Sequence, residues 1–243
     1  MTPLEIIRQA QADVLIDEDG QVVTLELIPG LSQAELQDFA DQMPCRIPPE
    51  VSELLGSCSG FYGTLEQVDF TGRDLTFEFE AAFPFGLPLA ADGYGNFWVV
   101  DLHPNTTRWG PIYFSCHDAP VILYQADSLE HFLSELFRLF EPPHRSLIDD
   151  VHEDRPAHVW QTNPGVLSYE QCLRSEDPVL SAFAKELDAS FQIIDLRRAE
   201  PGDGFSWGRY GPQTQIKRYR TYAVFAYRKP KSIISRLLGR APG

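Results

Sequence analysis

The chain has 243 residues, of which 43% are hydrophobic and 12% aromatic, so a wholly disordered chain is not expected. This length suits one large domain or two small ones. The formal net charge is −15 at pH 7, and a protein this acidic repels nucleic acid and attracts basic surfaces at long range.

The charge is unevenly distributed along the chain. Residues 1–150 contain 25 Asp and Glu, 6 Arg and no Lys, whereas residues 151–243 contain 14 basic and 10 acidic residues. From Ser190 onward there are 11 basic residues and 3 acidic ones. Two interpretations of the acidic half stay open: it attracts a basic partner, or it only keeps the protein in solution.

No targeting or membrane-spanning segment is expected. The N-terminal residues Met1–Glu5 lack a basic stretch followed by an apolar run, and no apolar segment approaches the ~18 residues that cross a bilayer. The cysteines Cys45, Cys58, Cys116 and Cys172 form no C-x-x-C pair, so we expect reduced thiols. The sequence therefore predicts a cytoplasmic protein.

The first 60 residues contain three helix signals around one strand. Thr2 and Glu5 form a capping box for the first helix, and Ser32 and Glu35 form another for a helix that runs to about residue 43. The third helix is predicted over 49–58, where two prolines suit the first turn. Alternating apolar residues predict a strand over 22–28.

Between residues 61 and 126 the hydrophobic period changes to two. Turn residues separate the apolar runs at hairpin-like intervals, so we expect an antiparallel sheet. Its predicted strands are Phe61–Val68, Leu75–Glu80, Leu87–Ala90, Phe97–Leu102, Ile112–Ser115 and Val121–Gln125. A helix capped by Ser128 follows, and its wide apolar face must cover the sheet. The predicted fold class is α+β, mainly an antiparallel sheet flanked by helices.

The rest of the chain is predicted to form a smaller unit. Residues 141–164 hold four prolines and three histidines with little hydrophobic periodicity, which indicates a linker. Short helices are expected over 168–173, 178–187 and 232–238, and strands over 191–198 and 219–228. Because two strands make a thin core, we expect this part to dock on the first. The predicted division is 1–145 for the first domain, 146–165 for a linker and 166–243 for a C-terminal α+β extension.

Several motifs over residues 35–140, taken in order, resemble the SUKH superfamily, which includes fungal cell-wall-assembly regulators and bacterial immunity proteins. They are Ile47-Pro48-Pro49-Glu50, Ser59-Gly60-Phe61, Asp92–Trp98 with Val99-Val100-Asp101, Pro111–Phe114, His117-Asp118 and the helix Ser128–Leu139. Ser59 stands where the family usually has Asn. The resemblance implies an α+β domain that binds proteins, often polymorphic toxin effectors, and that has no catalytic residues. It does not cover residues 150–243.

Several residues could have either a chemical role or only a structural one. The turn Asp92–Asn96 lacks the third glycine and the following helix of a dinucleotide fingerprint, so we interpret it as a structural turn. A zinc site needs three or four converging ligands. The candidates Asp101, His103, Cys116, His117 and Asp118 fall into two groups that nothing in the sequence brings together. We therefore predict no metal or other cofactor, and buried, inert cysteines.

Basic and aromatic residues alternate near the C-terminus, at Lys217–Arg220 and Arg228–Lys231. This composition suits nucleic acid or another anionic surface, but a basic face could equally dock on the acidic first half. We favour docking, and expect nucleic-acid binding only through this region if at all.

Together these features predict a non-catalytic, cytoplasmic protein-binding module. We expect an immunity protein that neutralises a toxin, such as a basic nuclease domain, through an acidic face on residues 60–126. The predicted contact residues are Asp69, Glu78, Glu80, Asp92, Tyr94, Trp98 and Asp101. Two alternatives stay open: a regulatory scaffold protein, and a metal-dependent hydrolase that uses the Asp101–Asp118 region.

Overall fold

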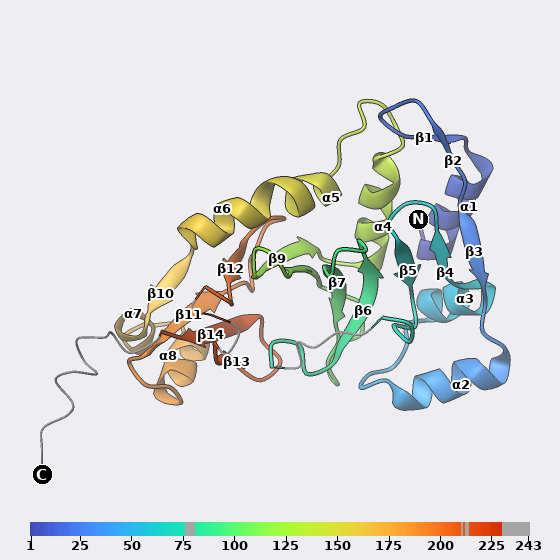
Figure 1. The fold of residues 1–243 in the computed structure, drawn as a ribbon. Coiled ribbons are helices and arrows are strands. Elements are labelled where there is room, and N and C mark those ends of the chain that lie inside the picture. Colours follow the sequence, from blue (N-terminus) through green and yellow to red (C-terminus); the bar gives the residue numbers. More distant parts are fainter. Residues whose placement is uncertain (76–80, 210, 212–213, 230–243) are drawn as a thin grey trace, which may run out of the picture.

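The computed structural model describes residues 1–75, 81–209, 211 and 214–229. A large antiparallel sheet occupies its centre (Figure 1). The strands of this sheet are β3 (Glu26–Pro29), β4 (Cys58–Tyr62), β5 (Gln67–Asp69), β6 (Gly86–Ala91), β7 (Phe97–Asp101), β8 (Ile112–Cys116), β9 (Val121–Ala126) and β12 (Gly204–Ser206). Their order across the eight-stranded sheet is β12-β9-β8-β7-β6-β5-β4-β3. The predicted α+β class with a mainly antiparallel sheet is confirmed.

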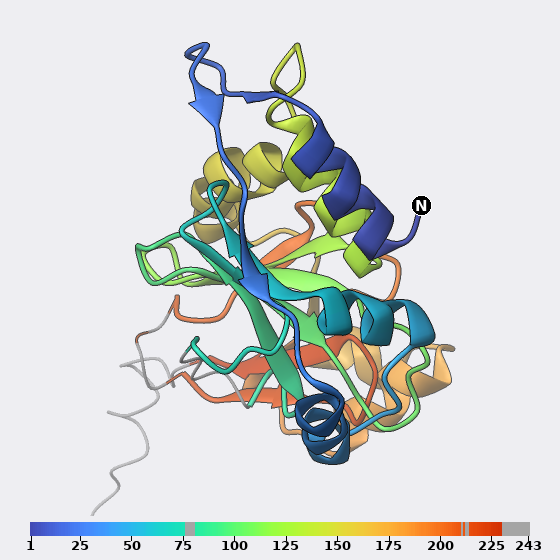
Figure 2. The same cartoon turned by 90° about the vertical axis from the view of Figure 1, so that its right-hand side faces the viewer.

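Helices cover one face of the large sheet, where they bury the first hydrophobic core (Figure 2). They are α1 (Pro3–Ala12), α3 (Pro49–Ser57) and α4 (Leu129–Arg138), while α2 (Gln33–Gln42) lies at the edge. Both predicted capping boxes are present, on Thr2 with Glu5 and on Ser32 with Glu35. The predicted strand over 22–28 is divided, because β2 (Val22–Val23) pairs with β1 (Leu15–Ile16) in a separate hairpin and only β3 joins the large sheet.

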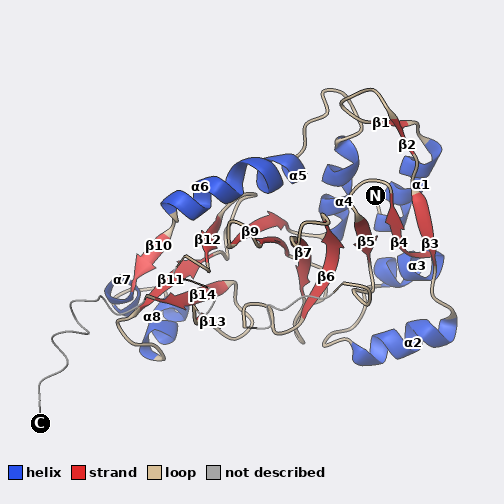
Figure 3. Ribbon diagram, in the orientation of Figure 1, coloured by secondary structure: helices blue, strands red, loops and turns tan. Residues whose placement is uncertain are grey.

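A second sheet covers the opposite face (Figure 3). Its strands are β10 (Val166–Ser168), β11 (Phe191–Asp195), β13 (Ile216–Arg218) and β14 (Val224–Arg228), in the order β10-β11-β14-β13. The helices α7 (Tyr169–Leu173) and α8 (Pro178–Lys185) pack on its outer face around a third core. The predicted strands over 191–198 and 219–228 are shorter than expected, since Leu196 and Tyr219 lie beyond their ends.

The central strands are therefore buried on both faces. Trp98 and Val100 point into the first core, and Val99 between them points into the second. On β9, Leu123 faces the helices whereas Ile122 faces the second sheet. Strands that are apolar at nearly every position are typical of sheets covered on two sides. Because both faces of the central strands are covered, side chains on either face of these strands are buried.

The segment predicted as a linker is helical over most of its length. It forms α5 (Leu147–Asp149), the π-helix η1 (Asp150–Asp154) and α6 (Arg155–Thr162). Its apolar residues Ile148, Val151 and Val159 are buried in the first core. Prolines and acidic residues interrupt the helical spacing of these apolar residues, so the sequence pattern did not predict a helix here. A buried amide fixes its start, because Gln125 accepts from Trp98 Nε1 at 3.0 Å and donates to the Leu147 carbonyl at 2.9 Å.

The C-terminal part of the chain contributes β12 to the edge of the large sheet, beside β9. Gly204, Phe205 and Ser206 pair with Leu123, Ile122 and Val121. The division into two domains and a linker stays a prediction. The predicted strand over 75–80 and the predicted helix over 232–238 lie outside the described residues, except for Leu75. None of the helices in the described part of the chain has the length and apolar character that a membrane crossing needs.

Candidate protein-binding surface

Several predicted contact residues are buried. Trp98 has no exposed surface, and Asp69 and Asp101 are 3% and 1% exposed. The expectation that these three lie on an exposed face is wrong. Trp98 packs in the core beneath the helices. Asp101 lies against the second sheet, and Asp69 binds the backbone of the turn that follows β5. Glu78 and Glu80 lie outside the described residues. Protein binding by the predicted set as a whole stays a prediction.

The two buried aspartates have structural partners. Both oxygens of Asp101 accept from the guanidinium of Arg218 on β13, each at 2.5 Å. This ion pair brings one residue of the basic C-terminal region onto the acidic first half. Asp69 instead holds the turn that follows β5: it accepts from the Thr71 backbone and hydroxyl, both at 2.7 Å, and from the Asp74 backbone at 3.0 Å.

The turn Asp92–Asn96 presents Tyr94, which is 79% exposed. Asp92 Oδ1 accepts from the Tyr94 backbone at 2.8 Å, and Asp92 Oδ2 accepts from Asn96 Nδ2 at 2.6 Å. Gly93 and Gly95 have φ of +82° and +87°, the left-handed region that glycine enters without strain. The turn therefore holds Tyr94 out into solvent by its own hydrogen bonds.

A histidine on η1 joins this turn to the helical segment. His152 Nε2 lies 2.9 Å from Asp92 Oδ2, and Nδ1 lies 2.8 Å from Glu153 Oε1. The ring also packs against Trp98 and Phe114, with centroids 5.4 and 5.2 Å apart. Burial acts to raise the pKa of Asp92, but hydrogen bonds from His152, Asn96 and two backbone N–H groups outweigh it and hold that pKa below its usual value. Short π-helical segments recur at functional sites.

Next to His152 the surface is hollowed and strongly acidic. We call this hollow, of about 630 Å³, the acidic trough. Its carboxylates come from the β1–β2 turn and from α5 and η1: Asp17, Glu18, Asp149, Asp150, Glu153 and Asp154. The basic side chains that line it are His144 and Arg145. Burial, followed by the charges of Glu153 and Glu18, raises the pKa of Asp149 above its usual value. Burial and the neighbouring negative charges therefore disfavour the ionised form of Asp149.

Sequence reasoning missed the acidic trough, because its two acidic segments are distant in the sequence. The one signal available was the density of acids over residues 149–154. In the sequence, that run is typical of a surface linker, and nothing in its pattern indicates that residues 17 and 18 lie opposite.

The residues proposed for metal chemistry are not arranged for it. Over the described ranges, no group of three or more His, Cys, Asp and Glu side chains is placed to hold a metal ion. Asp101 already binds Arg218 with both oxygens. All four cysteines are free and buried, and burial raises the pKa of Cys58 to about 11, so this thiol is protonated at neutral pH.

Comparison with known proteins bears on the central part of the chain. Residues 30–135 match the model of the SMI1 / KNR4 family (SUKH-1). Comparisons with curated proteins and with solved structures gave no significant match. The matched residues contain α2, α3, β4 to β9 and most of α4, whereas the carboxylates of the acidic trough lie before and after them. The predicted SUKH resemblance is confirmed over residues 30–135, which are similar to the SMI1 / KNR4 (SUKH-1) family.

Proposed function

We propose that this protein is a cytoplasmic, non-catalytic immunity protein that neutralises a basic protein toxin through the acidic trough. The family match supports a protein-binding immunity or regulatory module. The observation that carries the proposal is the convergence of six carboxylates on one hollow. A nuclease toxin binds polyanions through a basic surface, and such a surface would complement this hollow in charge.

The arrangement of the acidic trough favours the binding of a basic partner and not the stability of the free protein. Burial and the charges of Glu153 and Glu18 disfavour ionised Asp149, so a basic partner that enters the trough offsets an unfavourable interaction already present in the free protein. Tyr94 extends the contact surface, because the Asp92–His152–Glu153 hydrogen bonds connect its turn to the trough. An exposed tyrosine held by a rigid turn is a typical anchor in protein interfaces.

Affinity capture with charge-reversed baits tests this proposal. The full chain serves as bait in an extract of its native host, beside a trough variant (Asp150→Lys with Glu153→Lys) and a matched control (Asp38→Lys with Glu53→Lys). All four residues are exposed, and the two variants have the same net charge. We expect a basic protein on the wild-type and control baits, released at high salt and lost from the trough variant. Equal capture by all three baits would contradict the proposal.

The immunity role itself needs a second step. The captured protein is expressed alone and together with the full chain, and growth is measured. We expect growth arrest by the partner alone and rescue by the wild-type chain but not by the trough variant. A partner that binds the trough and causes no arrest would replace the immunity role with a regulatory one.

A further inference from the structure

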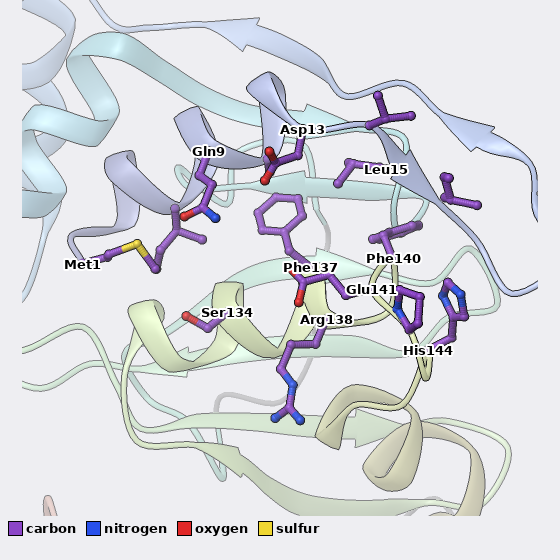
Figure 4. Close-up of a pocket in the computed structure, with 15 residues that line it drawn as sticks. Met1, Gln9, Asp13, Leu15, Ser134, Phe137, Arg138, Phe140, Glu141 and His144 are labelled. Carbon is purple, nitrogen blue, oxygen red and sulfur yellow. The ribbon is translucent and has the colours of Figure 1, made fainter.

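A second hollow, of about 570 Å³, lies between α1 and α4 and reaches the β1–β2 hairpin (Figure 4). We call it the apolar groove. Its lining is mostly apolar, and the Phe137 ring stands between the two helices, with Phe140 and Leu15 at the hairpin end. Each helix has ten residues and is therefore about 15 Å long, so the groove is bordered by helices of about three turns.

Exposed apolar side chains gather along this groove. Val14 is 70% exposed and Ile16 39% exposed, and both line it. Val22, 68% exposed, is the partner of Ile16 across the hairpin. Single exposed apolar residues need no explanation, but a contiguous group marks a surface that binds something apolar.

The charged residues around the apolar groove restrict which ligands can bind in it. The rim of the apolar groove carries Asp13 and Glu141. Arg138 also borders it but points away from α1 (Figure 4), and its guanidinium binds Glu135 at 2.6 Å. At the hairpin end the groove continues into the acidic trough, because Phe140 and His144 line both hollows. An apolar cleft thus opens onto a strongly acidic one.

We propose that the apolar groove binds a cationic amphipathic helix of the partner protein. A third helix fits between two helices when its apolar ridge fills the groove that they form. Its apolar face would pack on Val14, Ile16 and Phe137, and its basic residues would lie over the rim and the trough. This inference rests on the proposed function, since it names the part of the basic partner that the same surface binds.

Synthetic peptides test separately whether binding needs an apolar face and whether it needs basic residues. A fluorescent peptide of about 15 residues has Leu at helical i, i+3, i+4 spacing and Lys elsewhere; one control replaces Lys by Glu, and another replaces Leu by Ser. Binding to the full chain is measured by fluorescence anisotropy. We expect the Leu/Lys peptide to bind about tenfold or more tightly than either control, because only it matches both the apolar lining and the acidic rim.

Variants of the groove then locate the site. Val14→Asp with Ile16→Asp should weaken binding of the Leu/Lys peptide about tenfold or more, although the added negative charge alone would strengthen it. Phe85→Asp with Leu173→Asp, at exposed positions outside the groove lining, is the matched control and should not weaken binding. Val14→Ser with Ile16→Ser removes the apolar surface without charge and should weaken binding as well. Circular dichroism checks that each variant is folded.

The outcomes separate this inference from the proposed function. Unchanged peptide affinity in both groove variants would overturn the inference. The inference would also be overturned if the trough variant failed to capture the natural partner while the groove variants still captured it. That result would leave the proposed function intact. Concentration-dependent dimerisation of the wild-type chain that the groove variants abolish would show that a second copy, not a partner helix, occupies the groove.

Discussion

Arg218 on β13 and Asp101 on β7 form a buried two-pronged ion pair that joins the second sheet to the first. The two terminal guanidinium nitrogens of Arg218 each lie 2.5 Å from one carboxylate oxygen, and the side chains are 4% and 2% exposed. Arg218 also donates to the Ala82 carbonyl at 3.1 Å and lies over the Phe225 ring. The pair connects the family-matched segment to residues far beyond it.

Removing Arg218 should destabilise the protein strongly. Arg218→Ala leaves the Asp101 carboxylate buried without its partner, which typically costs about 3–5 kcal/mol of unfolding free energy. Urea denaturation followed by circular dichroism measures the change. Arg228→Ala is the comparison, because its pair with Asp188 is exposed and should contribute about 1 kcal/mol or less. If the buried charge is the cause, Arg218→Met with Asp101→Leu will be less destabilised than Arg218→Ala.

Adding a methyl group at Gly204 should disrupt the edge strand β12. A Cβ there would overlap the Ile122 carbonyl oxygen of β9, so Gly204→Ala should cost roughly 1–3 kcal/mol. Gly56 in α3 is the control position, since a Cβ there meets nothing within 4 Å. Gly56→Ala should stabilise the protein by up to about 1 kcal/mol. Thermal unfolding of the two variants should therefore move in opposite directions, and a stabilised Gly204→Ala would show that β12 does not pack as described.

The stabilisation from Asp92 should disappear in acid. Because its folded pKa lies below the unfolded value, the contribution is present above the unfolded pKa of about 3.9 and is lost as pH falls through the folded value. Asp92→Asn should thus be less stable than wild type by about 1–3 kcal/mol at pH 7, with a smaller difference at pH 3. Urea midpoints measured at both pH values check this. A difference that stays constant with pH would argue against the charged hydrogen bonds.

Asp149 should behave in the opposite way. Its folded pKa is raised, so the native state holds the proton more tightly than the unfolded chain does, and ionisation at higher pH costs stability. Asp149→Asn should therefore stabilise the free protein at pH 7, by about 1 kcal/mol or less because the site is partly exposed to solvent. The same variant should weaken capture of a basic partner. Lower stability of Asp149→Asn at pH 7 would contradict the raised pKa of Asp149.

Local signals in the sequence predicted the helices α1, α2 and α4 well. The capping boxes at Thr2 and Ser32 and the apolar face that follows Ser128 depend on residues within a few positions of one another, so they need no knowledge of the rest of the fold. The motifs around Asp92–Asp101 also pointed to the family whose model matches residues 30–135. The helical segment from residue 147 was missed because its apolar positions are interrupted by prolines and acids.

The sequence by itself determined the α+β class, the antiparallel strands, the charge asymmetry and the family segment. Only the tertiary structure decided which acidic residues face solvent. Strand periodicity assigns residues to faces but does not reveal that both faces are covered. Helices bury Trp98 on one face, and the second sheet buries Asp101 beside Arg218 on the other. The acidic trough likewise depends on the packing that brings residues 17 and 18 opposite residues 149–154. Such a surface is set by contacts between distant segments, because folding, and not proximity in the chain, determines which charges lie together.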